Sequence, residues 1–280
     1  MSGVVHDTQP AYFLYKMNTP HHASSIEILK NIALEAGTIV RKGFFASKEI
    51  THKGTVDLVT QYLATEQFIV EKLRAAFPEH RLIGEETHQG DYGAILEKAI
   101  YIDPIDGTTN FVHGVPHVAI SIAVYEHGEG QMGVVYNPIL DELYCAVRGE
   151  GACCNGKPIH VSTQDTLQQA LIATGFPYTK VERGADFDWV MNAMQHMLAD
   201  VRDIRRLGSA ALDLCYVGRG LMDGYYEIAL KPWDAAAGMI IAREAGAVIT
   251  SIDGTAVDFS NTSVVAANPT LHQQIVQQLR

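Results

Sequence analysis

Hydrophobic positions recur along this chain at two periods, one typical of helices and one typical of strands. A helical stripe follows the capping-box pattern Ser24-Ser25-Ile26-Glu27 and predicts an amphipathic helix that ends near Lys42-Gly43. A second helical stripe predicts a helix from about Tyr62 to Phe77. Between the two, residues 47–60 are expected to form two short strands, and Asp57–Thr60 is expected to close that hairpin.

Short apolar runs bounded by turn residues predict the remaining strands. They lie at residues 81–83, 98–102, 117–125, 131–136, 142–147, 170–173, 201–204, 222–228 and 264–267. Further helices are predicted at residues 186–198, 210–218, 233–245 and 269–280. Hairpins in the first half and strand–helix alternation in the second favour a mixed sheet system with helices between the layers.

Composition and charge narrow the class of protein. Residues 1–22 are expected to be a flexible N-terminal extension before one domain over residues 23–280. No apolar run reaches the roughly 18 residues of a membrane span, so no membrane association is expected. The four cysteines without a C-x-x-C pair, and the absence of a signal-peptide pattern, favour a reduced, cytoplasmic location. A formal net charge of −11 makes nucleic acid an unlikely partner.

The stretch Asp103–Phe111 carries the densest chemistry in the chain. Pro104 favours an extended Asp103 and begins a turn, and Gly107 can take backbone angles that other residues avoid. Thr108 and Thr109 are expected at a helix start, where backbone N–H groups are free to hold phosphate oxygens. The stretch therefore predicts carboxylates beside a phosphate cradle.

Acidic residues also end other predicted elements, at Glu85, Glu227 and Asp234. Two carboxylates 4 Å apart repel each other by about 4 kcal/mol at an effective dielectric constant of 20. A cluster of such acids therefore requires cations or shared protons. Because the donors are oxygens, Mg²⁺ suits them better than zinc, which prefers His and Cys.

Three motifs can be compared with known families. They are Gly84-Glu85-Glu86, the Asp103–Phe111 stretch and Trp233–Gly238. In order and interval they resemble the signatures of the inositol monophosphatase family, which belongs to a superfamily of lithium-sensitive, Mg²⁺-dependent phosphatases. The resemblance spans about residues 26–280, and Leu207–Asp213 is similar to the family's substrate-side segment in its bacterial form. It implies an α+β fold, a layered α-β-α-β-α sandwich with mixed sheets, and a homodimer.

The resemblance also implies a role for each matching residue. The metal ligands would be Glu85, Asp103, Asp106, Asp234 and the carbonyl of Ile105. The catalytic residues would be Glu85 and Thr108, which orient the attacking water, with Asp106. The substrate would be bound by Asp106, Gly107, Thr108, Thr109, Gly208, Ser209, Ala210, Glu227 and Asp234. Metal-activated water needs no side-chain nucleophile, so no phosphoenzyme is expected. His113 and His117 are interpreted as loop or core residues, because Pro116 forbids a helical metal pair.

One position departs from the family pattern. Leu63 stands where the family usually has an Asp that partners the threonine of the central stretch. Glu66 lies about one helical turn further on, and we hypothesise that it substitutes.

The leading hypothesis is thus a Mg²⁺-dependent phosphomonoesterase that hydrolyses inositol monophosphates. Alternative substrates are fructose 1,6-bisphosphate, histidinol phosphate, a 3′-phosphonucleotide or NADP. A regulatory binding protein with vestigial activity is an alternative of another class, and Leu63 is the only feature that favours it.

Overall fold

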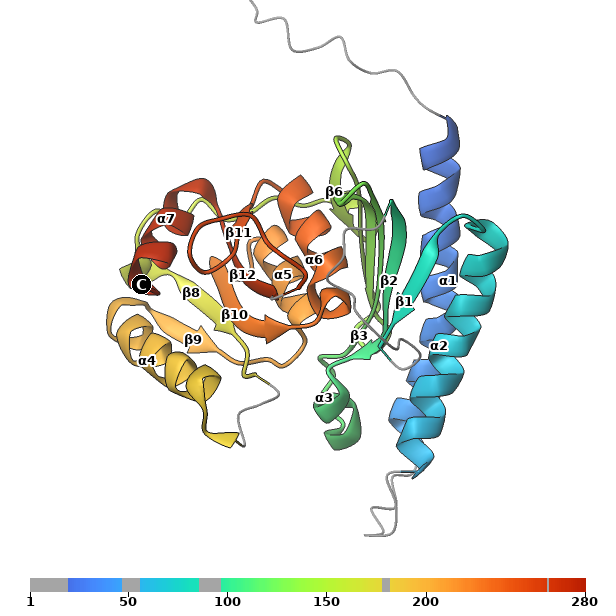
Figure 1. Cartoon of the computed structure of the whole chain (residues 1–280), viewed down its shortest axis with the longest axis horizontal. Coiled ribbons are helices and arrows are strands. Elements are labelled where there is room, and N and C mark those ends of the chain that lie inside the picture. The colour runs from blue at the N-terminus through green and yellow to red at the C-terminus, as the bar shows by residue number, and fades with distance from the viewer. Residues whose placement is uncertain (1–19, 47–55, 86–96, 178–181, 261) are drawn as a thin grey trace, which may run out of the picture.

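Five layers of secondary structure alternate across the molecule, as the computed structural model shows (Figure 1). The structure describes residues 20–46, 56–85, 97–177, 182–260 and 262–280. Two sheets separate an outer helix pair, a central helix pair and a second outer pair. The α-β-α-β-α sandwich with mixed sheets is therefore confirmed. Residues 1–19, most of the expected extension, lie outside the described residues, and the first helix begins at Pro20.

The first outer pair is α1 (Pro20–Phe45) and α2 (Val56–Ala76), which cover one face of a seven-stranded sheet. In spatial order its strands are β1 (Arg81–Gly84), β2 (Lys98–Asp106), β3 (Ala119–Glu126), β4 (Glu129–Asn137), β5 (Glu142–Val147), β6 (Gly151–Cys154) and β7 (Lys157–Pro158). β1 and β2 are parallel, and the other neighbours are antiparallel. A short helix, α3 (Thr108–His113), follows β2.

The second sheet has five strands. In spatial order they are β11 (Val248–Thr250), β12 (Thr262–Ala267), β10 (Gly224–Leu230), β8 (Leu171–Thr174) and β9 (Asp203–Arg205). β8 runs parallel to both of its neighbours, so the ends of β8 and β10 meet at one edge. The outer face carries α4 (Ala185–Asp200) and α7 (Pro269–Gln278), and a 3₁₀ turn, η1 (Leu167–Gln169), precedes β8.

The central layer consists of α5 (Ala210–Gly218) and α6 (Pro232–Glu244), packed between the two sheets. Small residues allow α5 and α6 to approach closely. A Cβ on Gly238 would lie 2.8 Å from the Cβ of Leu214, so only glycine fits at that contact. The close packing expected from the Ala-Ala-Ala-Gly run of α6 is confirmed.

Successive side chains along a strand point to opposite faces of its sheet and pack against the helices on each side. Ile100 and Ile102 of β2 pack toward α1 and α2, whereas Ala99 and Tyr101 pack toward α6. Because both faces of this strand are covered, its sequence is a continuous apolar run rather than an alternating one. None of the helices within the described ranges is both long and apolar enough to span a bilayer.

Residues 47–55, which hold most of the expected pair of short strands, lie outside the described residues. The other predicted elements are confirmed with two kinds of exception. Asp57–Thr60 was expected as a strand but belongs to α2, which begins at Val56. β-branched residues lower helix propensity by only tenths of a kcal/mol, so a helix stabilised further along extends through them. The sequence analysis also missed β6, β7 and β11, which have only four, two and three residues.

Candidate active site

The end of β2 carries the first two carboxylates. The strand continues through Pro104 to Asp106, beyond the turn expected at Pro104, with a shift in its register against β3 between Asp103 and Asp106. Oδ1 of Asp103 accepts a hydrogen bond of 2.9 Å from the Ile105 N–H. The two acids are close enough for the charge on Asp106 to raise the pKa of Asp103.

Gly107 joins β2 to α3 and takes a left-handed backbone conformation, with φ of 89°. A Cβ there would lie 2.8 Å from the His117 carbonyl oxygen, so both conformation and space require glycine. Within the described ranges, no side chain caps the start of α3. The first N–H groups of the helix, at Thr108 and Thr109, are therefore available to an external acceptor.

Asp106 connects this loop to the start of α5. Its Oδ2 accepts hydrogen bonds from the Ser209 hydroxyl at 2.6 Å and from the Ala211 N–H at 2.8 Å. The Ser209 hydroxyl in turn accepts from Leu212 N–H at 3.3 Å and so caps the helix. Two donors thus fix one oxygen of Asp106, and the other accepts no hydrogen bond from the part of the chain that the structure describes.

Asn110 also connects α3 to the segment before α5. Its Nδ2 donates to the carbonyl oxygens of His117 and Leu207, both at 2.8 Å. These bonds hold Leu207, and with it the segment that leads into α5, next to α3.

Asp234 lies in the first turn of α6 and is buried. Its Oδ2 accepts a 2.8 Å hydrogen bond from the Lys231 N–H, so the residue does cap its own helix. This structural role does not exclude binding through the second oxygen.

The acidic residues influence one another strongly. Burial raises the pKa of Asp103 well above its usual value. The neighbouring carboxylates raise that pKa further, in the order Glu85, Asp106 and Asp234. Burial also raises the pKa of Asp234, with the charge on Asp106 as the next cause. Burial raises the pKa of Asp106 to about 6, against the opposing hydrogen bond from Ser209.

Glu85 reaches this cluster because β1 is parallel to β2. Its N–H donates to the Ile102 carbonyl at 3.2 Å, which continues the pairing one residue past β1 and places Glu85 beside the end of β2. None of the ion pairs found among the described residues involves Asp103, Asp106 or Asp234.

The donor set fits a hard divalent cation in its chemistry. Buried carboxylates that repel each other, with no paired basic side chain, are stabilised by a cation bound through oxygen. The described side chains do not, however, include three His, Cys, Asp or Glu already gathered around one point. Electrostatic influence extends further than coordination, so these acids are neighbours whose rotamers have to adjust to share an ion.

A small polar cavity of about 80 Å³ lies beside the acids. Nine residues predicted to bind substrate line it: Asp106, Gly107, Thr108, Thr109, Gly208, Ser209, Ala210, Glu227 and Asp234. Sequence reasoning missed four further lining residues, Gly175, Phe176, Arg206 and Leu230. Gly175 and Phe176 directly follow β8, and a glycine at a strand end was the available signal.

Glu227 enters the cavity from β10. Its Oε2 accepts a 2.6 Å hydrogen bond from the Tyr225 hydroxyl. Burial raises the pKa of Glu227 to about 8, and the charge on Asp213 contributes to the rise. A Cβ on Gly175 would lie 2.0 Å from the Glu227 carboxyl group, so glycine leaves the space that this side chain fills. The guanidinium of Arg206 lies over the Phe176 ring, 5.1 Å from its centroid.

The two histidines have separate surroundings. α3 ends at His113, which is exposed, whereas His117 is buried and its Nε2 lies 3.0 Å from Oδ1 of Asp213. They do not share a helix. His117 is a core residue, as interpreted, whereas His113 is the last residue of α3 and not a loop residue.

Glu66 is fully buried on α2, and Leu63 is half-buried one turn earlier. A Cβ on Gly84 would lie 2.3 Å from Oε1 of Glu66, so this carboxyl group packs against the backbone just before Glu85. An additional acid therefore does approach the site from α2.

The comparison with protein families decides the identity of this arrangement. The model of the inositol monophosphatase family matches residues 22–280. The chain belongs to the inositol monophosphatase family.

Similar proteins agree over nearly the whole length. Inositol monophosphatase 1 of Solanum lycopersicum is 42% identical over 252 residues, which are 89% of this chain and 92% of the relative. Nus factor SuhB of Pasteurella multocida is 40% identical over 258 residues, 91% of this chain and 95% of that protein. The solved inositol monophosphatase of Anabaena superposes with a TM-score of 0.81 at 33% identity, covering 92% of this chain and 96% of its own.

These likenesses support a phosphatase of this family, whose members are generally metal-dependent. The family assignment predicted from the three motifs is confirmed.

Proposed function

We propose that this chain is a Mg²⁺-dependent phosphomonoesterase that hydrolyses inositol monophosphates to inositol and phosphate. The observation that carries the proposal is the composition of one cavity. It combines the uncapped start of α3, the acids Asp106 and Asp234, and Glu227 on the opposite strand. A phosphate group, its counter-ions and a hydroxylated ring require these three kinds of group side by side.

In this proposal the metal is held by side chains that already influence one another electrostatically. The ligands would be Glu85, Asp103, Asp106, Asp234 and the carbonyl oxygen of Ile105. When bound, Mg²⁺ supplies a water of lowered pKa and neutralises charge on the leaving oxygen.

The chain's own groups position the reactants. The N–H groups at Thr108 and Thr109 would hold phosphate oxygens, which can approach the backbone closely at Gly107 because it has no side chain. Glu85 and the Thr108 hydroxyl would orient the attacking water. Hydroxyl groups of the ring would lie against Gly208, Ser209, Ala210 and Glu227, which line the other side of the cavity.

Phosphate release from inositol 1-phosphate, measured with and without Mg²⁺, tests the proposal directly. We expect Mg²⁺-dependent turnover that falls to background in Asp103→Asn. Since that substitution removes one of several repelling charges, the metal-free variant should melt at the same or a higher temperature than the parent. Its melting temperature should also respond less to added Mg²⁺. Full activity of Asp103→Asn would remove the metal assignment.

The same assay separates the possible substrates. The panel adds fructose 1,6-bisphosphate, histidinol phosphate, a 3′-phosphonucleotide and NADP. Faster turnover of any of these than of inositol 1-phosphate would keep the chemistry and change the substrate.

A regulatory binding role is the second candidate, and one observation favours it. A relative with 40% identity carries the name Nus factor SuhB. Absence of Mg²⁺-stimulated phosphate release from every compound of the panel would support this candidate. A cytoplasmic homodimer with lithium-sensitive activity is proposed as well; light scattering and inhibition by LiCl test these properties.

A further inference from the structure

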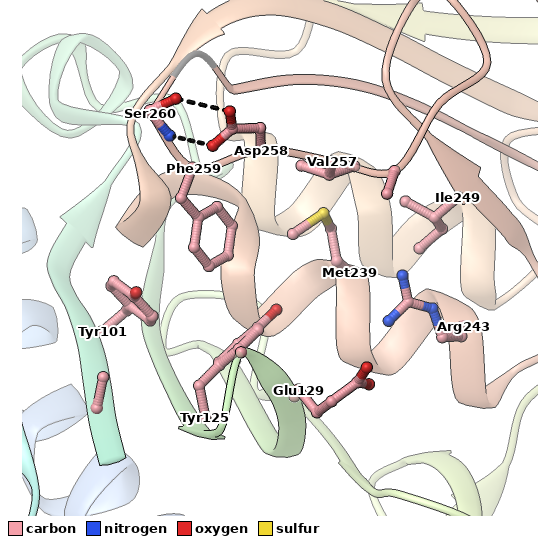
Figure 2. Close-up of a pocket in the computed structure, with 14 residues that line it drawn as sticks. Tyr101, Tyr125, Glu129, Met239, Arg243, Ile249, Val257, Asp258, Phe259 and Ser260 are labelled. Carbon is pink, nitrogen blue, oxygen red and sulfur yellow. Dashed lines mark hydrogen bonds between the residues drawn. The ribbon is translucent and has the colours of Figure 1, made fainter. Parts of the chain in front are cut away.

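A second cavity, of about 560 Å³, lies near the C-terminal end of α6, whereas the proposed active site lies at its N-terminal end. The two cavities share no lining residue. It is enclosed by the turn between β3 and β4, the C-terminal half of α6 and the segment at residues 256–260 (Figure 2). Its volume falls in the range of small-molecule sites, roughly 300–1,000 Å³.

One wall of this cavity is aromatic. Tyr101, Tyr125 and Phe259 meet edge to face, with ring centroids 5.1 to 5.5 Å apart. Figure 2 shows the three rings together on one side, with the Met239 side chain next to them. Such a wall offers a flat ring both dispersion contacts and edge-to-face geometry, and methionine adapts to its outline.

The opposite side of the cavity carries charge. Figure 2 shows the guanidinium of Arg243 pointing toward Met239 and Tyr125. Among the described residues, the Arg243 side chain forms no hydrogen bond or ion pair, and the Tyr101 hydroxyl also lacks a hydrogen bond. A guanidinium carries five donors in a planar fork, which suits a carboxylate or phosphate.

The two acids that line the cavity already have partners. Glu129 forms an ion pair with Arg148, with Oε2 and Nη2 3.2 Å apart. The Asp258 carboxylate accepts from the backbone N–H of Ser260 at 2.8 Å and from its hydroxyl at 2.7 Å. Of the charged side chains that line this cavity in the described structure, Arg243 is therefore the one that remains available to a ligand.

We propose that this cavity is a second ligand site, which binds a small aromatic anion. The ring of the ligand lies against Tyr101, Tyr125 and Phe259, and its carboxylate or phosphate pairs with Arg243. The site is independent of the phosphatase proposal, because its residues take no part in the predicted chemistry.

Three naphthalene probes with the same ring and different charges test whether the cavity binds an aromatic ring and which sign of charge it prefers. They are naphthoate, naphthamide and naphthylmethylamine, substituted at one ring position and titrated by calorimetry. We expect saturable binding of naphthoate, and binding at least about tenfold weaker for the neutral amide. The amine should bind most weakly. Naphthoate binding should be the same with and without saturating Mg²⁺, since Mg²⁺ would occupy the other site.

Two substitutions locate the binding. Arg243→Met keeps the aliphatic stem and should weaken naphthoate binding at least about tenfold, to the level of the amide. Ala256→Trp places a bulky ring at an exposed lining residue and should block all three probes without changing charge. Arg202→Met, at an exposed arginine outside the cavity, is the matched control and should bind naphthoate normally.

Melting curves identify variants that fail to fold, and either cavity variant suffices alone. The proposal is overturned if naphthoate shows no saturable binding to the parent protein. It is equally overturned if the amide or the amine binds as tightly as naphthoate, if naphthoate binding requires Mg²⁺, or if either folded cavity variant binds naphthoate normally.

Discussion

The structure allows the effect of Gly175→Ala on the free energy of unfolding to be worked out from its contacts. In Gly175→Ala the new Cβ would lie 2.0 Å from the Glu227 carboxyl group, which therefore has to move. The movement itself is easy for a side-chain end, but it breaks the 2.6 Å hydrogen bond from Tyr225. Tyr225 is fully buried, so its hydroxyl is left without a partner.

The size of the effect follows from two opposing terms. A buried polar group that loses its partner costs about 1–3 kcal/mol. Replacement of glycine by alanine stabilises by about 0.4–1 kcal/mol where the backbone tolerates it, because the unfolded chain loses freedom. Gly175 has no left-handed φ, so that gain applies here. We expect a net loss of about 1–2 kcal/mol in urea unfolding at neutral pH, and a raised KM for inositol 1-phosphate.

A double-mutant cycle isolates the cause. In Glu227→Ala the obstruction is gone, so adding Gly175→Ala should be neutral or stabilising. Gly184→Ala is the matched control, since a Cβ there meets no atom within 4 Å and its φ is −89°. If Gly175→Ala costs the same with and without the Glu227 side chain, the steric account is wrong and the loss has another origin.

Three further predictions concern the site and its surroundings. If Glu66 replaces the acid missing at Leu63, Glu66→Gln should lower Mg²⁺-dependent turnover; unchanged turnover, with a rise in Leu63→Asp, would contradict this. The pKa of Glu227, about 8, lies above its unfolded value near 4.3, so the folded state binds the extra proton. The free energy of unfolding that this raised pKa contributes is fully present below the unfolded pKa and is lost as the pH rises through about 8. In metal-free urea unfolding, Glu227→Gln should lessen that loss. Cys145 and Cys153 pair directly across β5 and β6 with sulfurs 2.9 Å apart, so mild oxidation with diamide should give an intramolecular disulfide. Mass spectrometry without reductant detects it, and persistence of both free thiols would contradict the expectation.

Local patterns predicted most elements because the deciding information is itself local. The apolar stripe of α1 and the strand runs of β2, β3 and β4 follow from side-chain period alone. The Asp57–Thr60 error shows the limit, since a few β-branched residues resemble a strand until the rest of the helix is known. β7 has two residues and no pattern to detect, so its pairing with β6 is visible only in three dimensions.

Some residues of the candidate site could be predicted from local sequence, and others could not. Asp106, Thr108 and Asp234 were predictable because each stands at the end of a recognisable element. Phe176 and Arg206 were not, because they join the cavity through the parallel pairing of β8 with β9 and β10. No sequence period states which strands will be neighbours.

The position of the acids links the proposed catalysis to the assembly of the fold. Asp106 ends a strand of the first sheet, Glu227 belongs to the second, and Asp234 begins the helix packed between them. Burial is the largest cause of the raised pKa of Asp234, and the charges on Asp106, Glu85 and Glu227 raise it further, so mutually repelling carboxylates meet where the layers pack together. A ligand that binds only the docked state stabilises it by mass action, and the proposed divalent cation at these oxygens would be such a ligand. In this account one equilibrium governs both metal binding and closure of the central layer, because the charges that a metal would neutralise are the ones that oppose packing.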